Sequence, residues 1–524
     1  MLVLTILFAL SLLSSPQLPI LGLPSVDIIG NQREVKSIIG TEKAGKNVPF
    51  KLDRKNIKYV KSANPVIHLR NAAAVAPDNP LVFGFYVNWD PASLTSLRAN
   101  IQNVTHLVPE WFTLSNSKGD ITDDSDPQVI RICRDAKLPI LAMVTNFRNG
   151  WQANDLRQML ESSTARANLI DNLIANAKEH QFAGMTIDFE QAKKADRSRL
   201  VAFMTELKAR FAQEGLLVAE AVPPDDDAYD LKALAATVDY IIPMVYDEHY
   251  QSGEPGPVAS EDWFEGQIDR LTKILPADKT IIGVGNYGYD GIIGGSSATE
   301  FSFQQVRSAA KANRAAITGD KDMENPVLRY VSKVSGDQHE IWFLDAVTAL
   351  NQIQAVNDTG FRGAGVWRLG GEDADMWRVF ENHQWPSDHY NPAQLTSMSS
   401  IKIVDRYGDG DILRVTNTPH DGKRKVWLDS NEDYAEEYLD YPTYYSLETT
   451  GPAAGTGNKM VITFDDGPDP TWTPQILAVL KEKNVPATFF VIGLNAEAFP
   501  NLVRRIYQEG HMVGNHTYSH PNVA

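Results

Sequence analysis

The 524-residue sequence has a single cysteine, no long run of basic residues and a net charge of −17. Cys133 therefore has no partner within the chain for a disulfide bond, although large domains fold without such bonds, so their absence does not exclude export. The cysteine lies in an apolar-periodic segment, which favours a small buried hydrophobic residue over a nucleophile. An acidic chain without a basic face is poorly suited to nucleic acid. A neutral polymer such as a glycan fits this charge better.

The first 24 residues are largely apolar and contain no basic residue. Their length approaches the roughly 20 residues that a membrane span requires. We expect a signal peptide or signal anchor at 1–24, and hence a protein that is exported or attached to a membrane through its N-terminus. The alternative is a buried N-terminal helix, which the prolines at 16, 19 and 24 disfavour. Residues 25–80 are polar and mixed, and are expected to form a stalk or linker.

From Leu81 onward, short apolar runs alternate with longer segments of helical periodicity, including 164–179, 197–213 and 263–274. This alternation is typical of an α/β protein with a parallel sheet. Eight strands in roughly 300 residues fit a closed (β/α)8 TIM-type barrel at 81–386, with a doubly wound open sheet as the alternative. The predicted strands are 81–88, 105–109, 139–146, 184–190, 216–222, 240–246, 280–287 and 363–367.

The fourth predicted strand ends in two acidic residues, Asp188 and Glu190. Side chains two apart in a strand point the same way, so both acids share a face with Thr186. Other strands also end in polar or aromatic residues, and in a barrel these ends meet at the face where catalytic residues lie. A polar strand edge that runs into the exposed segment 191–194 is the alternative interpretation. The residues at the other strand ends are Asn146, Tyr246, Asp247 and Trp367.

The pattern Gly-x-x-x-Asp-x-Glu at 184–190 resembles the signature of glycoside hydrolase family 18, the chitinase-like barrels. Flanking stretches are similar to the branch of this family that includes spore-cortex peptidoglycan hydrolases. The resemblance covers roughly residues 81–386. The stretches that support it are 84–86, 145–147, 221–224, 243–247 and 363–367.

The resemblance implies a substrate-assisted mechanism, which departs from the usual scheme of two catalytic carboxylates. Glu190 would protonate the glycosidic oxygen. Asp188 would orient the substrate's own N-acetyl group, which attacks the anomeric carbon. The resemblance also implies that Tyr246 bonds the acetamide carbonyl, that Asp247 and Asn146 hold the sugar, and that Trp367 forms the floor of the −1 subsite.

Two positions depart from the family pattern. Where the family usually has an acid, this sequence has Ala183, and where it usually has Asp or Asn, this sequence has Thr186. Thr186 would still offer a hydroxyl to Asp188. These departures leave two interpretations open: an active glycoside hydrolase, or a degenerate barrel that serves as a glycan-binding or scaffolding module.

Residues 387–457 lose the strand–helix rhythm, and turn signals at 408–410 and 420–422 predict a small β-rich linker module. Its last residues, 451–457, have the composition of a flexible joint. From residue 458 the strand–helix alternation returns, with strands at 460–464, 487–492 and 511–514 and helices at 473–483 and 499–509. Residues 458–524 are thus expected to be the first part of a second (β/α) barrel domain.

The sequence at 463–468, Thr-Phe-Asp-Asp-Gly-Pro, together with the His-Thr-x-x-His pattern at 516–520, resembles the NodB-type polysaccharide deacetylases of carbohydrate esterase family 4. The resemblance implies that Asp466, His516 and His520 bind a divalent metal, with zinc expected, and that Asp465 is the general base. Since the histidines are four apart, one helical turn would present both imidazoles to a single metal. The family's later motifs have no counterpart here, and in long relatives a glycosyltransferase domain follows.

Both resemblances point to polymers of N-acetylglucosamine. We therefore expect a carbohydrate-active protein of a bacterial cell envelope that deacetylates such a glycan. If the barrel is active, the protein also hydrolyses the glycan.

Overall fold

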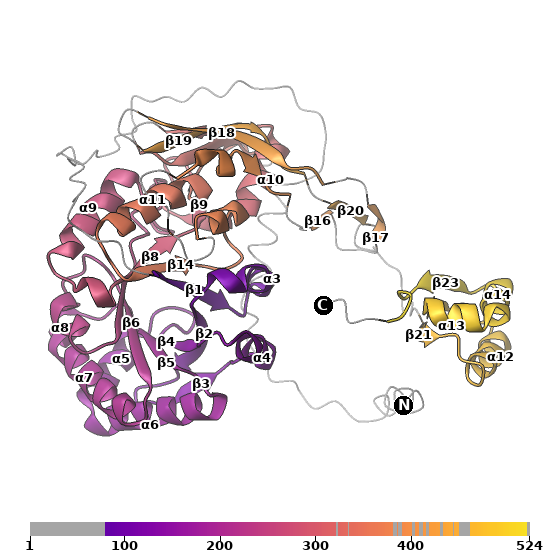
Figure 1. Cartoon of the computed structure of the whole chain (residues 1–524), viewed down its shortest axis with the longest axis horizontal. Coiled ribbons are helices and arrows are strands. Elements are labelled where there is room, and N and C mark those ends of the chain that lie inside the picture. Colours follow the sequence, from indigo (N-terminus) through magenta and orange to yellow (C-terminus); the bar gives the residue numbers. More distant parts are fainter. Residues whose placement is uncertain are drawn as a thin grey trace. The chain divides into compact units, whose positions relative to one another are not determined.

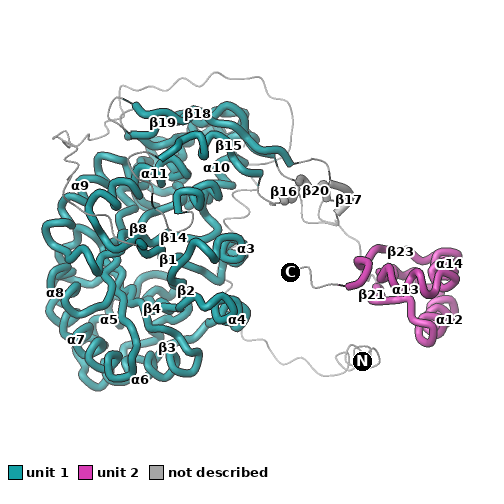
Figure 2. The backbone as a smooth tube through the Cα atoms, viewed as in Figure 1, with its two compact units in different colours: residues 1–403, 418–444 teal, residues 404–417, 445–524 magenta. Residues whose placement is uncertain are grey.

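The computed structural model describes residues 79–320, 323–333, 335–380, 385, 390–400, 404–407, 412–415, 419–429, 433–443, 445–449 and 462–520. The chain forms two compact units, one of residues 1–403 with 418–444 and one of residues 404–417 with 445–524 (Figure 2). The predicted signal segment at 1–24, almost all of the stalk and the joint at 451–457 lie outside the described residues. Within the described ranges, no helix has both the length and the apolar character needed to cross a membrane.

The first unit is built around a parallel β-barrel (Figure 1), as predicted. Its strands follow the order β7-β6-β5-β4-β2-β1-β14-β8. Isolated parallel bridges join Ile241 to Thr280 and Met244 to Gly283, so the two end strands meet and the open-sheet alternative is wrong. The barrel strands are β1 (Leu81–Val87), β2 (His106–Leu114), β4 (Leu141–Thr145), β5 (Gly184–Asp188), β6 (Leu217–Val222), β7 (Tyr240–Pro243), β8 (Ile281–Gly285) and β14 (Gly363–Trp367), and β3 (Ile121–Asp123) pairs with β2.

Helices surround the barrel, and two apolar cores hold the layers together. The smaller core fills the barrel with side chains such as Phe83, Phe85 and Met143. The larger core lies between strands and helices and includes Ile187 and Phe189. Because side chains alternate along β5, Thr186 and Asp188 face the barrel interior, which confirms the predicted faces of this strand. The helices are α3 (Pro91–Asn100), α4 (Pro127–Ala136), α5 (Ala153–Glu161), α6 (Ser163–His180), α7 (Arg197–Gln213), α8 (Leu231–Ala235), α9 (Glu261–Thr272) and α11 (Ala346–Asp358).

A second sheet, which the sequence did not predict, is inserted between β8 and β14. The predicted strand 280–287 is interrupted at Asn286, and the chain continues into an antiparallel sheet of order β10-β9-β13-β12-β11. This sheet packs on one helix through its own small core, which includes Phe301, Val306 and Ile341. The elements of the insertion are β9 (Tyr287–Ile292), β10 (Ala298–Ser302), α10 (Phe303–Asn313), β11 (Ile317–Gly319), β12 (Pro326–Val331) and β13 (Gln338–Phe343).

The strands of the predicted linker module are divided between the two units. Arg424 on β18 is fully buried in the first unit and forms ion pairs with Asp345 (3.2 Å), Asp373 (3.0 Å) and Glu436 (3.3 Å). These contacts join the β18–β19 hairpin to the barrel's own helical layer. The first unit holds β15 (Ser397–Met398), β18 (Gly422–Leu428) and β19 (Tyr434–Asp440), and the second holds β16 (Val404–Tyr407), β17 (Ile412–Val415) and β20 (Tyr445–Thr449).

The remainder of the second unit is a small three-stranded parallel sheet with helices. Its order is β21-β22-β23, and its apolar core includes Leu477, Phe489 and Ile506. These strands and two of the helices were predicted, whereas the short α13 was not. The elements are β21 (Thr463–Gly467), α12 (Thr473–Lys483), β22 (Thr488–Val491), α13 (Gly493–Ala498), α14 (Pro500–Gln508) and β23 (Met512–Asn515).

Candidate active site

Glu190 lies just beyond the carboxyl end of β5, and its backbone is fixed by the neighbouring strand end. Its N–H donates to Asn146 Oδ1 (2.9 Å), and Asn146 Nδ2 donates back to the Glu190 carbonyl (3.0 Å). The Tyr229 hydroxyl donates to the Phe189 carbonyl (2.8 Å). Asn146, for which the sequence predicts a substrate contact, is fully buried and holds the Glu190 backbone through these two hydrogen bonds. These bonds fix the backbone that carries the Glu190 side chain.

Three carboxyl groups influence one another at this end of the barrel: Asp188, Glu190 and Glu110 on β2. Burial raises the pKa of Glu190 to about 7, and the charges of Asp247 and Glu110 add to the rise. Burial likewise raises the pKa of Glu110 to about 7. The pKa of Asp188 lies well above its usual value, because the carboxyl is buried and because Glu190 and Glu110 are near. Carboxylic acids with such values retain protons near neutral pH, as general acid catalysis requires.

Asp188 does not receive the hydrogen bond predicted from Thr186. The Thr186 hydroxyl donates to the Leu141 carbonyl instead (3.1 Å), because it lies alongside the neighbouring strand β4. Asp188 Oδ1 is buried and has no hydrogen-bond partner within the described part of the chain. No motif in the sequence marks Glu110, yet the strand register places it level with Thr186, since both residues pair with Met143. At this level of the barrel, β2 therefore contributes the carboxyl group of Glu110, whereas β5 contributes only the hydroxyl of Thr186.

Asp247 is held by two tyrosines from the inserted sheet. The Tyr289 hydroxyl donates to Asp247 Oδ1 (2.8 Å), and the Tyr287 hydroxyl donates to the same oxygen. Loss of solvent raises the pKa of Asp247, and these two hydrogen bonds oppose the rise. Burial and then the charges of Asp188, Asp247 and Glu190 raise the pKa of Tyr246. Tyr246 therefore stays protonated and can donate a hydrogen bond among these acids.

Aromatic and charged side chains complete the rim. Trp367, at the end of β14, is half-buried, and its ring packs edge-on against Phe85 with 5.5 Å between centroids. The next residue, Arg368, forms ion pairs with Asp90 (2.6 Å) and Glu300 (3.4 Å). Its guanidinium lies 4.1 Å from the ring centroid of the exposed Trp89. Trp367 was predicted, whereas the Arg368 cluster carries no sequence signal that marks it.

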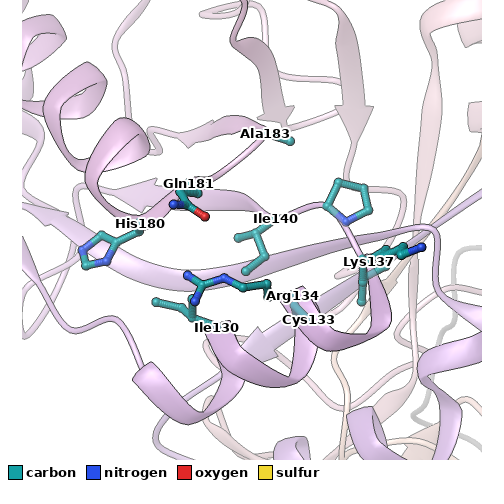
Figure 3. A pocket seen from close by; sticks show the side chains of 10 residues that line it. Ile130, Cys133, Arg134, Lys137, Ile140, His180, Gln181 and Ala183 are labelled. Atoms are coloured by element: carbon teal, nitrogen blue, oxygen red, sulfur yellow. The ribbon is translucent and has the colours of Figure 1, made fainter.

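A hollow of about 330 Å³ lies elsewhere on the first unit (Figure 3). Its lining comes from α4 and the two residues after it, from the end of α6 and the residue after it, and from Pro139, Ile140 and Ala183, which precede strands β4 and β5. Asp188 and Glu190 lie at the other end of β5. Since barrel chemistry is found at the carboxyl ends of the strands, the carboxyl cluster, and not this hollow, is the candidate site.

A second candidate site lies in the second unit, where Asp466 meets two histidines. His516 Nε2 lies 3.2 Å and His520 Nε2 3.4 Å from Asp466 Oδ1. One ligand atom from each residue lies within 4.8 Å of the others. Two imidazoles and a carboxylate are a donor set suited to zinc and similar divalent ions. Asp465, beside Asp466 on β21, is exposed. The residues predicted to bind a metal are therefore close enough together to do so.

The two histidines do not lie on a helical turn, so that part of the prediction is wrong. They follow β23 in a bend in which Thr517 and His520 have left-handed φ angles of 65° and 52°. The Thr517 N–H donates to Asn515 Oδ1 (2.8 Å), and the His520 N–H donates to Thr517 Oγ1 (3.0 Å). Side chains of the loop thus satisfy the backbone in place of a helix, and they bring the imidazole centroids to 5.0 Å.

Comparison with known proteins gives two matches along the chain. Residues 81–373, more than half of it, match the model of Glycosyl hydrolases family 18, and residues 453–524 match that of Polysaccharide deacetylase. YdhD of Bacillus subtilis, named as a sporulation-specific glycosylase, is 32% identical over 263 residues, which are 48% of this chain and 62% of YdhD. The peptidoglycan-N-acetylglucosamine deacetylase of Bacillus cereus is 62% identical over 73 residues, 14% of this chain and 26% of that enzyme.

The fold also matches a solved structure. The spore cortex-lytic enzyme SleL of Bacillus megaterium superposes with a TM-score of 0.54 at 24% identity, over 59% of this chain and 74% of SleL, which shows a shared fold. The chain spans less than two thirds of the length of both YdhD and the B. cereus deacetylase. The second match identifies the C-terminal residues as part of a polysaccharide deacetylase domain.

Proposed function

Because the chain belongs to glycosyl hydrolases family 18, we propose that its barrel hydrolyses a glycan containing N-acetylglucosamine, with Glu190 as the proton donor. The observation that carries this proposal is the pKa of Glu190, raised to about 7 at the carboxyl end of β5. A carboxylic acid with that pKa is largely protonated at mildly acidic pH and can protonate a leaving oxygen. Its fixed backbone adds the positional precision that proton transfer needs.

In the proposed reaction the Glu190 proton passes to the glycosidic oxygen as the bond from that oxygen to the anomeric carbon breaks. The carbonyl oxygen of the substrate's N-acetyl group forms the new bond to that carbon, so the substrate supplies the nucleophile. Asp188 orients the acetamide, Tyr246 donates to its carbonyl, and Asp247 and Trp367 hold the sugar. A water molecule then attacks the anomeric carbon, gives its proton to the Glu190 carboxylate and releases the restored acetamide.

The substrate and the location follow from the relatives by analogy. SleL is named for the spore cortex, and the B. cereus deacetylase for peptidoglycan N-acetylglucosamine. We propose that the substrate is a cell-wall polymer with N-acetylglucosamine units, and that the protein acts in the bacterial cell envelope. Attachment to the membrane through residues 1–24, and a glycosyltransferase domain in a longer form, belong to the same proposal.

A second proposed function, N-deacetylation, rests on the cluster of Asp466, His516 and His520. These residues would hold a divalent ion, for which we propose zinc, and the ion would supply Lewis acidity toward the acetamide carbonyl. Asp465 is exposed beside the cluster and is proposed to accept the proton of the attacking water. Deacetylation breaks the C–N bond of the acetamide and releases acetate and a free amine.

Substrate assistance is tested with two sets of glucosamine oligomers, fully N-acetylated and fully de-N-acetylated, analysed for chain length by mass spectrometry. We expect the first set to be shortened and the second to stay intact at any practical enzyme concentration, because a free amine cannot supply the carbonyl nucleophile. Equal shortening of both sets would reject substrate assistance. Binding of the acetylated set without shortening would favour the glycan-binding module.

Metal binding is tested by zinc content after dialysis, without reference to activity. We expect the double variant His516→Ala/His520→Ala to lose the zinc that the wild-type protein retains, because a single carboxylate remains in the cluster. His420→Ala, an exposed histidine outside the cluster, should retain it. Equal zinc content in the double variant and the wild type would exclude this ligand set.

A further inference from the structure

A group of acids outside both candidate sites lies where α9 meets the start of β19, within the first unit. One carboxylate oxygen from each of Glu261, Glu265 and Asp433 lies within 4.8 Å of the others. Glu261 and Glu265 are four residues apart and so share a face in the first turns of α9, and Asp433 immediately precedes β19. Helix α9 and the residue before β19 are far apart in the sequence, yet their carboxylates lie close together in the fold.

Glu261 shows that this is more than a solvated acidic surface. Glu261 is only 1% exposed, and neither of its carboxylate oxygens, Oε1 and Oε2, has a hydrogen-bond partner among the residues that the structure describes. Burying a carboxylate without a partner is costly unless a cation or a proton compensates the charge. The neighbouring charges that act on it with the largest effect, after burial, are those of Asp433 and Glu265, which are acids themselves.

The two backbone segments that carry Glu261 and Asp433 are held by hydrogen bonds. Asn351 of α11 bonds Tyr434, the residue after Asp433, through both its amide atoms: Nδ2 donates to the Tyr434 carbonyl and Oδ1 accepts from the Tyr434 N–H, each at 2.9 Å. At the other segment, the Glu261 N–H donates to the Met323 carbonyl (3.3 Å). The packed fold therefore fixes the two backbone segments from which Glu261 and Asp433 extend.

We propose that Glu261, Glu265 and Asp433 form a calcium site that links α9 to the β18–β19 hairpin. The donors are all oxygens, with no imidazole or thiolate, which favours a hard cation. Calcium accepts six to eight oxygens in irregular geometry, so water can complete the shell beside Glu265 and Asp433, which are less buried than Glu261. Magnesium fits less well, because it demands near-ideal octahedral geometry.

The proposal is tested by isothermal titration of Ca²⁺ into the metal-stripped full chain, together with thermal unfolding in EDTA and in 1 mM Ca²⁺. We expect one site with a dissociation constant on the order of 10⁻⁴ M or tighter, and an increase in Tm on adding Ca²⁺, because a ligand that binds only the folded state stabilises it. Glu261→Gln and, as a second variant, Asp433→Asn should each weaken calcium binding at least tenfold and remove the increase in Tm.

Two controls separate this site from other acids. Asp269→Asn removes an exposed carboxylate from the same helix, and Asp466→Asn removes one from the cluster in the second unit; both should retain the calcium response. A wild-type protein that binds no Ca²⁺ at 1 mM, with a higher Tm in Glu261→Gln, would show that protons alone compensate the buried charge and would overturn the proposal. Undiminished calcium binding in Glu261→Gln and Asp433→Asn would overturn it as well.

Discussion

At the scale of single residues, the barrel site depends on how Asp188 is neutralised. Its Oδ1 is buried without a partner among the described residues, and the hydroxyl of Thr186 is turned toward the Leu141 carbonyl. Burial raises the pKa of Asp188 most, and the nearby carboxyls Glu190 and Glu110 add to the rise. Burial and mutual repulsion keep protons on these carboxyl groups, and in the proposed reaction Glu190 donates such a proton to the glycosidic oxygen.

Glu110 should influence the pH at which Glu190 loses its proton. Its charge is one of the causes that raise the pKa of Glu190. Glu110→Gln removes this repulsion, so the pKa of Glu190 should fall, and the proton donor should lose its proton at a lower pH. We expect the basic limb of the pH profile of kcat/KM to move to lower pH by about half a unit to one unit. Asp171→Asn, far along α6 and exposed, should leave the profile unchanged, and an unshifted profile in Glu110→Gln would contradict this role.

The sequence predicted the residues that lie at strand ends and missed those that lie within strands. Asp188, Glu190 and Trp367 were predicted because parallel strands bring their carboxyl ends to one face. Glu110 could not be identified in the same way, because it interrupts the apolar stretch Leu107–Phe112 without any motif. His516 and His520 do lie close to Asp466, as the motifs predict, but their spacing predicts a helical turn, whereas a loop with left-handed residues brings them together.

At the scale of elements, the inserted sheet and the β18–β19 hairpin are what distinguish this unit from a bare barrel. The insertion delivers Tyr287 and Tyr289 to Asp247. The eight barrel strands could be predicted from alternation of apolar and helical segments, whereas the insertion could not, because its short antiparallel strands interrupt that rhythm. The position of the hairpin could not be predicted either, since Asp345 and Asp373, the partners of Arg424 outside the hairpin, lie 79 and 51 residues away in the sequence.

Arg424 should be essential for the stability of the first unit. Arg424 is the only cation that the described contacts show beside Asp345, Asp373 and Glu436. Replacing it by Met leaves these buried carboxyl groups without a positive charge next to them. Loss of one partner from a buried ion cluster costs about 3–5 kcal/mol, so we expect a decrease of that size in the free energy of unfolding, measured in urea by tryptophan fluorescence. Lys425→Met, which breaks the exposed pair with Glu437, should change it little. Similar stabilities in the two variants would contradict this account of the hairpin.

At the scale of the whole molecule, the chain joins two compact units, of which one matches Glycosyl hydrolases family 18 and the other Polysaccharide deacetylase. Each unit has its own apolar core, and each candidate site is formed within one unit. The order of the units could be predicted, because motifs mark both. The boundary between the units could not be predicted. Long-range contacts assign some strands of 387–457 to the first unit and others to the second, and no local sequence pattern indicates this division.

The barrel is proposed to hydrolyse N-acetylglucosamine polymers with Glu190 as the proton donor. The most direct test measures the formation of new reducing ends from N-acetylglucosamine oligomers by the wild-type protein, by Glu190→Gln and by the control Glu206→Gln, which changes an exposed acid on α7. We expect Glu190→Gln to reduce kcat by about 10²- to 10⁴-fold and Glu206→Gln to match the wild type. Chain shortening by Glu190→Gln at the wild-type rate, or no shortening by the wild-type protein, would contradict the claim.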